Sequence, residues 1–421
     1  MKKIFLIAAL VSFLTLSTTP LLEDRSQAGK EVDVIKENTN ADIQTIVGLY
    51  PSNGQVVNIL KPYATAYIRA MHEQAKGIVN DYVINDLNGD TVRIRDYCRP
   101  AFADDYSKKV MFYFDTNGGT NTYVIDISLS QDMSNPITIS EKADGYYVEN
   151  LLSGTTYYWQ VRSTDGSETS PVYTFETEGG FRMLSTANVR NFRDMGGRPV
   201  KGGKRIKQGL IFRSGEMVRE TYRVNGNGDR HHGNLDEESL RIIRDDLNVD
   251  IQIDFRGDAE ANNITESELK DEQHPEIEYM RHPIGAYGGL LVGAKYKPMI
   301  KEIFLTFMNA ENKHVVFNCW GGADRTGTIG FLLGGLLGMS WTDLVIDFEL
   351  TSFSQNTRSH LEVEPTSGYY DFPGLVEGIQ NSPYYSEGKE ISEFVKDWLI
   401  GFAGLTAEEV ETIKTNLLED C

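Results

Sequence analysis

The feature that most constrains the fold of this chain is a short apolar run that leads into a glycine-rich turn and then into a longer apolar segment, between residues 314 and 339. The run His314-Val-Val-Phe-Asn318 is β-branched and aromatic, which is typical of a buried strand. The turn Cys319-Trp-Gly-Gly-Ala-Asp-Arg325 follows it, and the apolar segment to Met339 indicates a helix. Such a turn can point successive N–H groups at one tetrahedral anion, at the positive end of the helix. The sequence therefore predicts a phosphate-binding loop in an α/β domain.

Two side chains of this turn carry the chemistry that the pattern predicts. Cys319 is expected to be the nucleophile, because a helix N-terminus and a nearby guanidinium favour a thiolate over a thiol. Arg325 is expected to clamp the phosphate, because its planar fork matches two phosphate oxygens and lysine would not. Thr326 is expected to donate a hydroxyl hydrogen bond to the sulfur. The residues expected to line the substrate are Trp320, Gly321, Gly322, Ala323, Thr326 and Gly327.

The leaving group also needs a proton, since a phenolate or alkoxide is expelled slowly at neutral pH without an acid. Asp324 is the first candidate, and negative charge on the thiolate and phosphate would keep its carboxyl group partly protonated. Asp254 is the second candidate; no Trp-Pro-Asp acid loop occurs in the chain. Water would then hydrolyse the cysteinyl-phosphate. This scheme needs neither a metal ion nor another cofactor.

A buried structural cysteine before an ordinary strand-to-helix turn is the alternative interpretation of the motif. The Cys-x5-Arg spacing alone is weak support for catalysis, because charged residues are common. The strand before the turn, the glycines within it and the sequence Arg325-Thr-Gly327 after it favour catalysis. Gly330, Gly334 and Gly338 repeat in the helix that follows, each costing about 1 kcal/mol relative to alanine. A close approach of this helix to the sheet is therefore expected.

Four further passages of the sequence fit a known pattern. They are Asn191-Phe-Arg-Asp-Met-Gly-Gly197, Leu210-Ile-Phe-Arg-Ser-Gly215, Ile253-Asp-Phe-Arg256 and Asp347-Phe-Glu-Leu-Thr351. Together with the Cys319 turn, they resemble the bacterial tyrosine phosphatase family with dual protein and phosphoinositide activity, whose loop reads His-Cys-x-x-Gly-Lys-Asp-Arg-Thr-Gly. The resemblance covers about residues 187 to 351.

The resemblance implies a role for particular residues. It implies catalytic roles for Cys319, Asp324 and Arg325, as expected from the turn itself. The further residues to which it gives a supporting role near the loop are Asp254, Arg256, Arg193 and Asp194. By composition alone, these four residues would be surface or structural salt bridges.

Two positions of the loop depart from the family's pattern. Asn318 replaces the histidine before the nucleophile, and Ala323 replaces the loop lysine. The first change removes a group that helps to hold the cysteine loop, and the second removes a charge that would bind extra phosphates. With a formal net charge of -20, the chain is expected to prefer phosphotyrosine or another monophosphate ester. The alternatives are a phosphoinositide or inositol-polyphosphate phosphatase and a weakly catalytic phosphate-binding module.

The N-terminal part of the chain predicts export. Lys2 and Lys3 precede an apolar run from Ile4 to Leu16 and then a polar flank, which is typical of a secretory signal peptide over residues 1–26. The expected location is the periplasm, the cell envelope or the medium, with an uncleaved anchor as the alternative. Only three cysteines are present, so at least one thiol remains free in an oxidising compartment.

The expected domain order follows from a change of period along the chain. Residues 27–80 are expected to form a polar lead with a possible helix after Pro62. The period of two that is typical of strands runs from Lys108 to Gly179, within a domain expected to span residues 81–178. The passage Leu151-Leu-Ser-Gly-Thr-Thr-Tyr-Tyr-Trp-Gln-Val-Arg162 resembles the signature of fibronectin type III domains, which implies an all-β sandwich. Residues 179–421 alternate strand-like and helix-like runs, so we expect an α/β domain of the protein-tyrosine-phosphatase type. A phosphorylated protein or small phosphate ester is the expected partner, and nucleic acid is not, because the surface is acidic.

Overall fold

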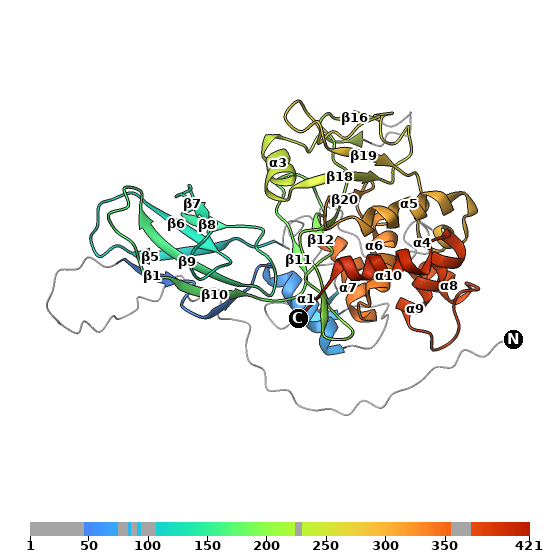
Figure 1. Cartoon of the computed structure of the whole chain (residues 1–421), viewed down its shortest axis with the longest axis horizontal. Helices are drawn as coiled ribbons and strands as arrows, with labels where there is room; N and C mark the ends of the chain where they lie inside the picture. Colours follow the sequence, from blue (N-terminus) through green and yellow to red (C-terminus); the bar gives the residue numbers. More distant parts are fainter. Residues whose placement is uncertain (1–45, 75–82, 86–90, 94–106, 224–229, 355–371) are drawn as a thin grey trace. The chain divides into compact units, whose positions relative to one another are not determined.

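The computed structural model of the chain describes residues 46–74, 83–85, 91–93, 107–223, 230–354 and 372–421 (Figure 1). The chain divides into two units, Met1–Asp42 with Asn85–Thr91, and Ile43–Ile84 with Val92–Cys421. The elements discussed below belong to the second unit, except that the short strands Val83–Asn85 and Thr91–Arg93 each have one residue in the first. The expected signal peptide at residues 1–26 and one of the three cysteines, Cys98, lie outside the described residues.

Strands dominate the described residues from 46 to 177. The strands are β1 (Val47–Tyr50), β2 (Gln55–Val57), β5 (Val110–Asp115), β6 (Tyr123–Ser128), β7 (Ile137–Ile139), β8 (Tyr146–Val148), β9 (Thr156–Ser163) and β10 (Tyr173–Thr177), with a short pair β3 (Val83–Asn85) and β4 (Thr91–Arg93). They form a sheet in the order β1-β5-β8 and another in the order β2-β10-β9-β6-β7. Buried and partly exposed residues alternate along β9, with Trp159 and Val161 inside. The rings of Trp159 on β9 and Phe112 on β5 pack edge to face, with their centroids 5.2 Å apart. The two sheets therefore share one aromatic core.

The first two strands differ from the expected division at residue 81. β1 pairs antiparallel with β5 and β2 pairs parallel with β10, although both belong to the segment expected to be a lead. Helix α1 (Pro62–Gln74) begins at the proline, whose missing N–H costs nothing in the first turn of a helix. Its buried Tyr67 packs 5.4 Å from Phe353, within the core of the α/β domain. The segment expected to be a lead therefore supplies β1 and β2 to the sheets of the strand-rich region, and α1 to the core of the α/β domain.

A central six-stranded sheet organises the α/β domain, in the order β11-β12-β15-β20-β18-β19. Its strands are β11 (Arg182–Met183), β12 (Arg193–Asp194), β15 (Ile211–Ser214), β20 (His314–Asn318), β18 (Val249–Asp254) and β19 (Glu278–Arg281). Strands β15, β20, β18 and β19 run parallel to one another. Strand β12 runs antiparallel to β15, and β11 runs antiparallel to β12. Along β20, Val315 and Phe317 join the core on one face while Val316 joins the core on the other. Burial on both faces explains why this strand is continuously apolar.

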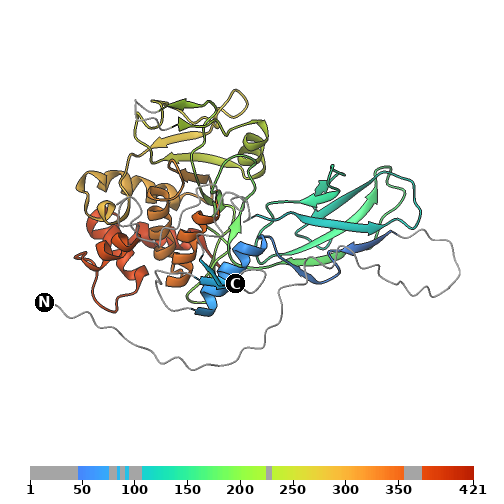
Figure 2. The ribbon, with the colours of Figure 1, turned by 180° about the vertical axis from the view of Figure 1, so that it is seen from behind.

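Helices cover the sheet, as the front and back views show (Figures 1 and 2). They are α3 (Glu237–Arg241), α4 (Tyr287–Val292), α5 (Lys297–Met308), α6 (Arg325–Leu337), α7 (Trp341–Glu349), α8 (Phe372–Gln380), α9 (Ile391–Trp398) and α10 (Ala407–Leu417). Short strands β13 (Pro199–Val200), β14 (Lys204–Ile206) and β21 (Leu418–Asp420) form one small sheet, and β16 (Tyr222–Arg223) pairs with β17 (Arg230–His231). The strand expected before Cys319 and the helix expected after the turn are confirmed as β20 and α6. Helix α3 continues as a π-helical turn from Ile242 to Asp246. Among the residues that the structure describes, no helix combines the length and apolar character that crossing a bilayer requires.

The three glycines that repeat through α6 and its C-cap, Gly330, Gly334 and Gly338, serve three different purposes rather than the single one expected. A Cβ on Gly330 would lie 2.8 Å from Nη1 of Arg213 on β15, so this glycine does permit close approach to the sheet. A Cβ on Gly334 would instead meet Met339 at 2.5 Å and Leu344 of α7 at 3.0 Å. Gly338 ends the helix in the left-handed conformation, with φ of 91°. The expectation of sheet contact therefore holds at Gly330 alone among the three.

Candidate active site

The phosphate-binding loop lies at the carboxyl edge of the parallel strands. β20 ends at Asn318, Cys319 follows it, and α6 begins at Arg325 with Asp324 as its N-cap residue. Asn318 lies between Ser214 of β15 and Asp254 of β18 in the strand register. Because the carboxyl ends of neighbouring parallel strands meet at one edge, the loop is flanked by the residues that follow β15 and β18. The expected order of strand, loop and helix is thus confirmed, with Cys319 only 1% exposed.

The carbonyl groups of the loop are held by donors from neighbouring segments. The Trp320 carbonyl accepts hydrogen bonds from the Glu216 N–H at 2.9 Å and from Arg190 at 3.1 Å. Nδ2 of Asn191 donates to the Gly321 carbonyl at 3.0 Å, and Nη2 of Arg213 donates to the Gly322 carbonyl at 3.0 Å. With the oxygens turned to these donors, the peptide units present their N–H edges to the opposite side, which is the arrangement that an anion requires.

Gly322 is indispensable to this loop conformation. Its φ is 68°, a left-handed value that side chains rarely adopt, and an added Cβ would lie 2.5 Å from the carbonyl carbon of Ser214. Backbone meets backbone at this point, so no side-chain movement could relieve the contact. The close approach brings the loop against the end of β15.

Behind the loop, three buried arginines share one buried aspartate. Nε of Arg193 lies 3.1 Å from Asp347 Oδ1, Nη2 of Arg198 lies 2.7 Å from the same oxygen, and Nη1 of Arg213 pairs with Oδ2. All four side chains are at most 4% exposed. The cluster of Arg193, Arg198, Arg213 and Asp347, here called the arginine cluster, therefore places an excess of positive charge beneath the loop. Buried charge is screened little, so it acts on any anion bound above it.

The pKa values of the arginine cluster reflect this crowding. Burial would raise the pKa of Asp347, but Arg193, Arg213 and Arg198 together hold it well below its usual range. Burial and repulsion from Arg193 lower the pKa of Arg213 to about 9, against attraction from Asp347 and Cys319. At neutral pH Asp347 is therefore ionised and Arg213 remains charged.

Arg325 is fixed by an acidic residue from the segment after β18. Its Nη1 donates to Glu260 Oε2 at 2.7 Å and to the Phe255 carbonyl at 3.1 Å, and its Nη2 donates to Glu260 Oε1 at 2.6 Å. A guanidinium has five N–H donors, so these three bonds leave Nε–H and one hydrogen of Nη2. Both remaining donors lie on the same edge of the plane. That edge is the fork that binds two oxygens of one phosphate.

The ion pair also sets the charge states of its partners. Burial acts to lower the pKa of Arg325, but its hydrogen bonds to the Glu260 carboxylate and the charge of Cys319 raise that pKa above its usual range. Burial would raise the pKa of Glu260, whereas Arg325 lowers it below the ordinary value. The pair is therefore ionised at neutral pH, and Arg325 keeps its full charge for a phosphate.

We expect Glu260→Gln to raise the KM for a phosphate monoester by about 10-fold with a smaller change in kcat, because the guanidinium loses the ion pair that orients its fork. Steady-state kinetics on p-nitrophenyl phosphate would measure both constants. A lower KM would contradict this role, since it would mean that repulsion between the Glu260 carboxylate and the phosphate outweighs orientation.

Asp324, the first candidate for the acid, is held by a tyrosine of α4. The hydroxyl group of Tyr287 donates to Asp324 Oδ1. The Asp324 carbonyl accepts from the backbone and the hydroxyl group of Thr328, each at 2.8 Å, as the first turn of α6 forms. The carboxyl group thus stands at the start of the helix, between the nucleophile and Arg325 along the chain.

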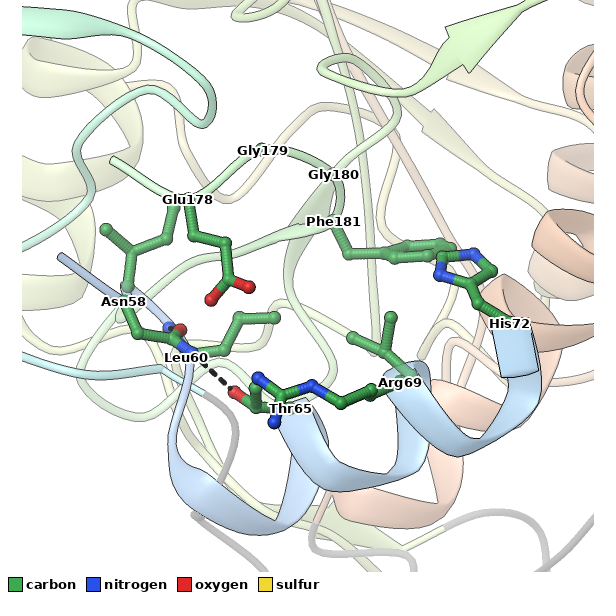
Figure 3. A pocket seen from close by; sticks show the side chains of 11 residues that line it. Asn58, Leu60, Thr65, Arg69, His72, Glu178, Gly179, Gly180 and Phe181 are labelled. Atoms are coloured by element: carbon green, nitrogen blue, oxygen red, sulfur yellow. Dashed lines mark hydrogen bonds between the residues drawn. The ribbon is translucent and has the colours of Figure 1, made fainter. Parts of the chain in front are cut away.

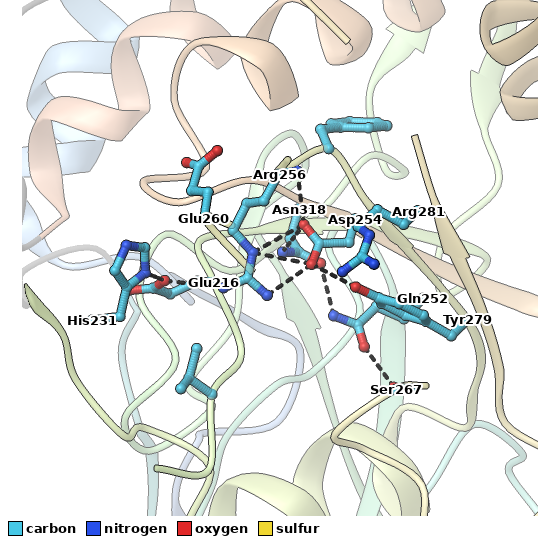
Figure 4. A network of polar contacts seen from close by, with 12 residues as sticks. Glu216, His231, Gln252, Asp254, Arg256, Glu260, Ser267, Tyr279, Arg281 and Asn318 are labelled. Atoms are coloured by element: carbon cyan, nitrogen blue, oxygen red, sulfur yellow. Dashed lines mark hydrogen bonds and ion pairs between the residues drawn. The ribbon is translucent and has the colours of Figure 1, made fainter. Parts of the chain in front are cut away.

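Asp254, the second candidate, belongs to a closed polar network (Figure 4). Its Oδ2 accepts from Arg256 Nη2 at 2.7 Å and from the Tyr279 hydroxyl at 3.0 Å, and Oδ1 accepts from the Arg256 N–H at 2.9 Å. Asn318 donates weakly to Oδ1, at 3.5 Å. Asp254 is fully buried, and its oxygens are taken up by protein donors. The geometry therefore suits a supporting residue better than an acid that meets substrate.

Asn318 is part of the same network, at the position where the resembling family has histidine. Its Oδ1 accepts from Gln252 Nε2 at 3.0 Å, and Gln252 in turn accepts from Ser267 at 2.5 Å. Nη1 of Arg256 lies 3.2 Å from Oε2 of Glu216, which extends the network to that carboxylate. The Glu216 carboxylate also pairs with the buried His231. The amide of Asn318 is thus anchored on both sides, and the strand before Cys319 is fixed without a histidine.

The remaining residues predicted to line the substrate lie within the loop, at its rim or in the first turn of α6. Gly321 and Ala323 are buried within the loop, and Trp320 is 36% exposed at its rim, with the Arg190 guanidinium 5.6 Å from its ring centroid. Gly327 lies in α6, where an added Cβ would meet Phe348 at 2.9 Å and Arg213 at 3.3 Å. These positions place the predicted lining residues in or directly after the loop.

Two expectations about supporting side chains need correction. Thr326 Oγ1 is buried and has no hydrogen-bond partner among the described residues, so the expected bond to the Cys319 sulfur is not made. Arg193 supports the loop through Asn191 and Asp347, but Asp194 does not face it. Asp194 pairs with Arg182 at 2.7 Å and accepts from the N–H groups of Gly196 and Gly209. Adjacent residues of a strand point to opposite faces of the sheet, which explains why Arg193 supports the loop and Asp194 does not.

Four residues that the structure brings to the site were not predicted from the sequence. They are Glu260, Tyr287, Arg213 and Asp347. Arg213 and Asp347 lie within passages that carried the family resemblance, so that pattern was a usable signal. Glu260 and Tyr287 lie outside every motif, and no local period marks them.

A cavity of about 350 Å³ lies away from the phosphate-binding loop (Figure 3). Its lining comes from α1, from the segment before α1 and from the glycine pair at residues 179–180, with Arg69, His72 and Glu178 among the charged groups. No residue of the 319–325 loop contributes to it. The candidate active site is therefore the loop and not this cavity.

Comparison with known proteins agrees with the geometry of the loop. A family model described as the tyrosine phosphatase family matches residues 184–419. A protein of Cupriavidus necator, provisionally named a tyrosine-protein phosphatase, is 25% identical over 197 residues, which cover 42% of this chain and 66% of that relative. Because the family model matches more than half of the chain, and its span includes the loop from Cys319 to Arg325, the chain belongs to the tyrosine phosphatase family.

Proposed function

We propose that this protein is a phosphatase that hydrolyses phosphate monoesters, and phosphotyrosine most readily, through a cysteinyl-phosphate intermediate. The observation that carries the proposal is the alignment of three groups on one loop. Cys319 directly follows a buried strand, the loop carbonyls are turned to outside donors, and Arg325 keeps two N–H groups on one edge of its guanidinium plane. A monoester dianion fits this arrangement with its phosphorus near the sulfur.

The proposed reaction has two displacement steps. The Cys319 thiolate attacks phosphorus, the P–O bond to the leaving group breaks, and the Asp324 carboxyl group gives its proton to the departing oxygen. A water molecule then attacks the cysteinyl-phosphate, gives a proton to the Asp324 carboxylate, and releases the thiolate as the S–P bond breaks. Arg325 and the loop N–H groups bind the three equatorial oxygens in both steps. The sum is one ester and one water converted to an alcohol and phosphate.

The choice of a single-phosphate aromatic substrate rests on the rim of the loop. Ala323 is buried where the resembling family has a lysine, so this position offers no charge to a second phosphate. The ring centroids of Trp320 and His231 lie 5.6 Å apart at the loop. The ring of Tyr222 stacks on that of His231, with 4.8 Å between the centroids. Such aromatic side chains favour a phenyl ring over an inositol ring, since flat rings stack on each other.

A substrate comparison tests the proposed class. We expect kcat/KM for a phosphotyrosine peptide to exceed that for phosphoinositides and for inositol hexakisphosphate by at least about 10-fold, as the loss of one charged contact implies. Phosphate release from the purified protein, measured on all three at equal ionic strength, gives the ratio. A preference for the polyphosphates would assign the protein to the phosphoinositide or inositol-polyphosphate class. Binding of phosphate without turnover of any ester would assign it to the weakly catalytic class.

We also infer that the protein is exported and that the strands before residue 178 form a fibronectin type III-like domain. The basic and apolar start of the chain supports export, and the passage from Leu151 to Arg162 supports the domain type. The alternation of buried residues along β9 is what such a domain requires. Mass spectrometry of the mature N-terminus after expression would detect removal of about the first 26 residues, and an intact Met1 in a membrane fraction would indicate an anchor instead.

A further inference from the structure

We propose that Tyr287 is a positioning residue that holds the Asp324 carboxyl group in line for proton transfer to and from the reacting oxygens. This inference rests on the proposed phosphatase function and assigns a role outside all the motifs of the sequence. Tyr287 is the first residue of α4, and its hydroxyl group donates to Asp324 Oδ1. An acid must keep its proton within hydrogen-bond reach of the leaving oxygen, so its side chain cannot be left to rotate freely.

Both ends of Tyr287 are attached to the same turn of α6. Its backbone N–H donates to Thr328 Oγ1 at 2.9 Å, and the Thr328 hydroxyl donates to the Asp324 carbonyl at 2.8 Å. The hydroxyl end reaches the carboxyl group of Asp324. Main chain and side chain of Asp324 are therefore connected to one residue, which fixes the carboxyl group relative to the loop.

The backbone of Tyr287 is strained in a way that this role explains. Its φ is 55°, a left-handed value that is a true outlier for a bulky aromatic residue. Strain of this kind persists only when the surroundings determine the conformation, and it gathers at functional sites. Here α4 packs against α8, with a Cβ on Gly378 reaching to 2.7 Å from the Cα of Gly288. The glycine contact fixes the start of α4, and the left-handed turn directs the ring toward Asp324.

The ring of Tyr287 is buried as well as anchored. It is 8% exposed, and its centroid lies 6.3 Å from that of Phe348 on α7. Phe348 also limits the space beside Gly327 in the first turn of α6. Removing only the hydroxyl group would therefore leave the ring in place and delete its hydrogen bond to Asp324 Oδ1, which makes the role testable by a small substitution.

The test is Tyr287→Phe, assayed on aryl phosphates that differ in leaving group. We expect kcat/KM, which reports only the steps through formation of the cysteinyl-phosphate, to fall by about 10-fold on phenyl phosphate, whose leaving group needs a proton. On 2,4-dinitrophenyl phosphate kcat/KM should change by less than about twofold. Asp324→Asn is expected to show the same selectivity with a larger loss. The double variant should be no slower than Asp324→Asn alone, because the tyrosine acts through that carboxyl group.

Tyr123→Phe is the matched control, since the Tyr123 hydroxyl donates to Glu168 at 2.7 Å in the strands before residue 178. It should leave every rate unchanged. Thr328→Val removes the hydrogen bond between the Tyr287 N–H and Thr328 Oγ1, and it should selectively slow the hydrolysis of phenyl phosphate. Thr328→Ser should restore the rate. This pair of variants tests the role if Tyr287→Phe does not fold.

Equal losses on good and poor leaving groups, or losses that add to those of Asp324→Asn, would overturn the positioning role and leave the phosphatase function intact. Failure of the unmodified protein to hydrolyse any of the esters would overturn the proposed function and this role with it. Selective loss in Tyr287→Phe, with rates unchanged in Tyr123→Phe, is the supporting result.

Discussion

Replacement of Cys319 by serine is expected to lower kcat on p-nitrophenyl phosphate by at least about 10⁴-fold, because an alcohol at this position is not ionised and attacks phosphorus far more slowly than a thiolate. Serine is nearly the same size, and Cys319 is 1% exposed, so the loop should keep its conformation. Initial rates over a range of enzyme concentrations would measure the loss. Binding of inorganic phosphate, measured by calorimetry, should survive, since Arg325 and the loop backbone are unchanged.

The control for this substitution is Cys421→Ser, because Cys421 is a free, exposed thiol at the end of the chain. It should leave kcat unaltered. Full activity in the Cys319 variant would rule out the covalent mechanism and leave the loop as a binding site. Loss of activity in both variants would point to general thiol sensitivity instead.

Replacement of Asp347 by asparagine is expected to lower the free energy of unfolding by about 3 to 5 kcal/mol, since it leaves the guanidiniums of Arg193, Arg198 and Arg213 buried without their shared carboxylate. Asparagine has the same shape, so the loss reports charge and not packing. Urea unfolding followed by tryptophan fluorescence would measure it. A loss below about 1 kcal/mol would mean that the arginine cluster is as solvated as a surface pair.

The same variant should change the response of stability to acid. The folded-state pKa of Asp347 lies below the unfolded value of about 3.9, so its stabilisation is fully present above that pH and is lost as the pH falls through the folded value. Asp347→Asn should therefore be less sensitive to acid than the unmodified protein. Asp144→Asn is the control, because Asp144 is 68% exposed in its pair with Lys109 and should alter neither quantity by much.

The sequence predicted those features that local patterns encode. The apolar run before Cys319 and the glycines after it determine a strand, a loop and a helix, because burial and turn geometry act over a few residues. The parallel order of β15, β20 and β18 follows from the alternation of strands and helices. Cys319 and Arg325 lie at the two ends of this loop, as the spacing of the motif predicts.

Features that depend on distant pairing could not be predicted in this way. Glu260 precedes Arg325 by 65 residues, and no period relates them. Tyr287 takes a backbone conformation that sequence preferences disfavour for an aromatic residue. The short strands Val47–Tyr50 and Gln55–Val57 were missed because three or four residues carry too little alternation to detect. In each case tertiary contacts outweigh local preference.

The arginine cluster also determines when during synthesis the site can become competent. Its cations come from residues 193, 198 and 213, whereas the shared carboxylate is Asp347, which leaves the ribosome more than a hundred residues later. A nascent chain that ends after the Cys319 loop would have to hold these cations together without Asp347, at a cost that opposes closure of the loop. Closure of the phosphate-binding loop over these cations therefore depends on α7, the helix that brings Asp347 to them.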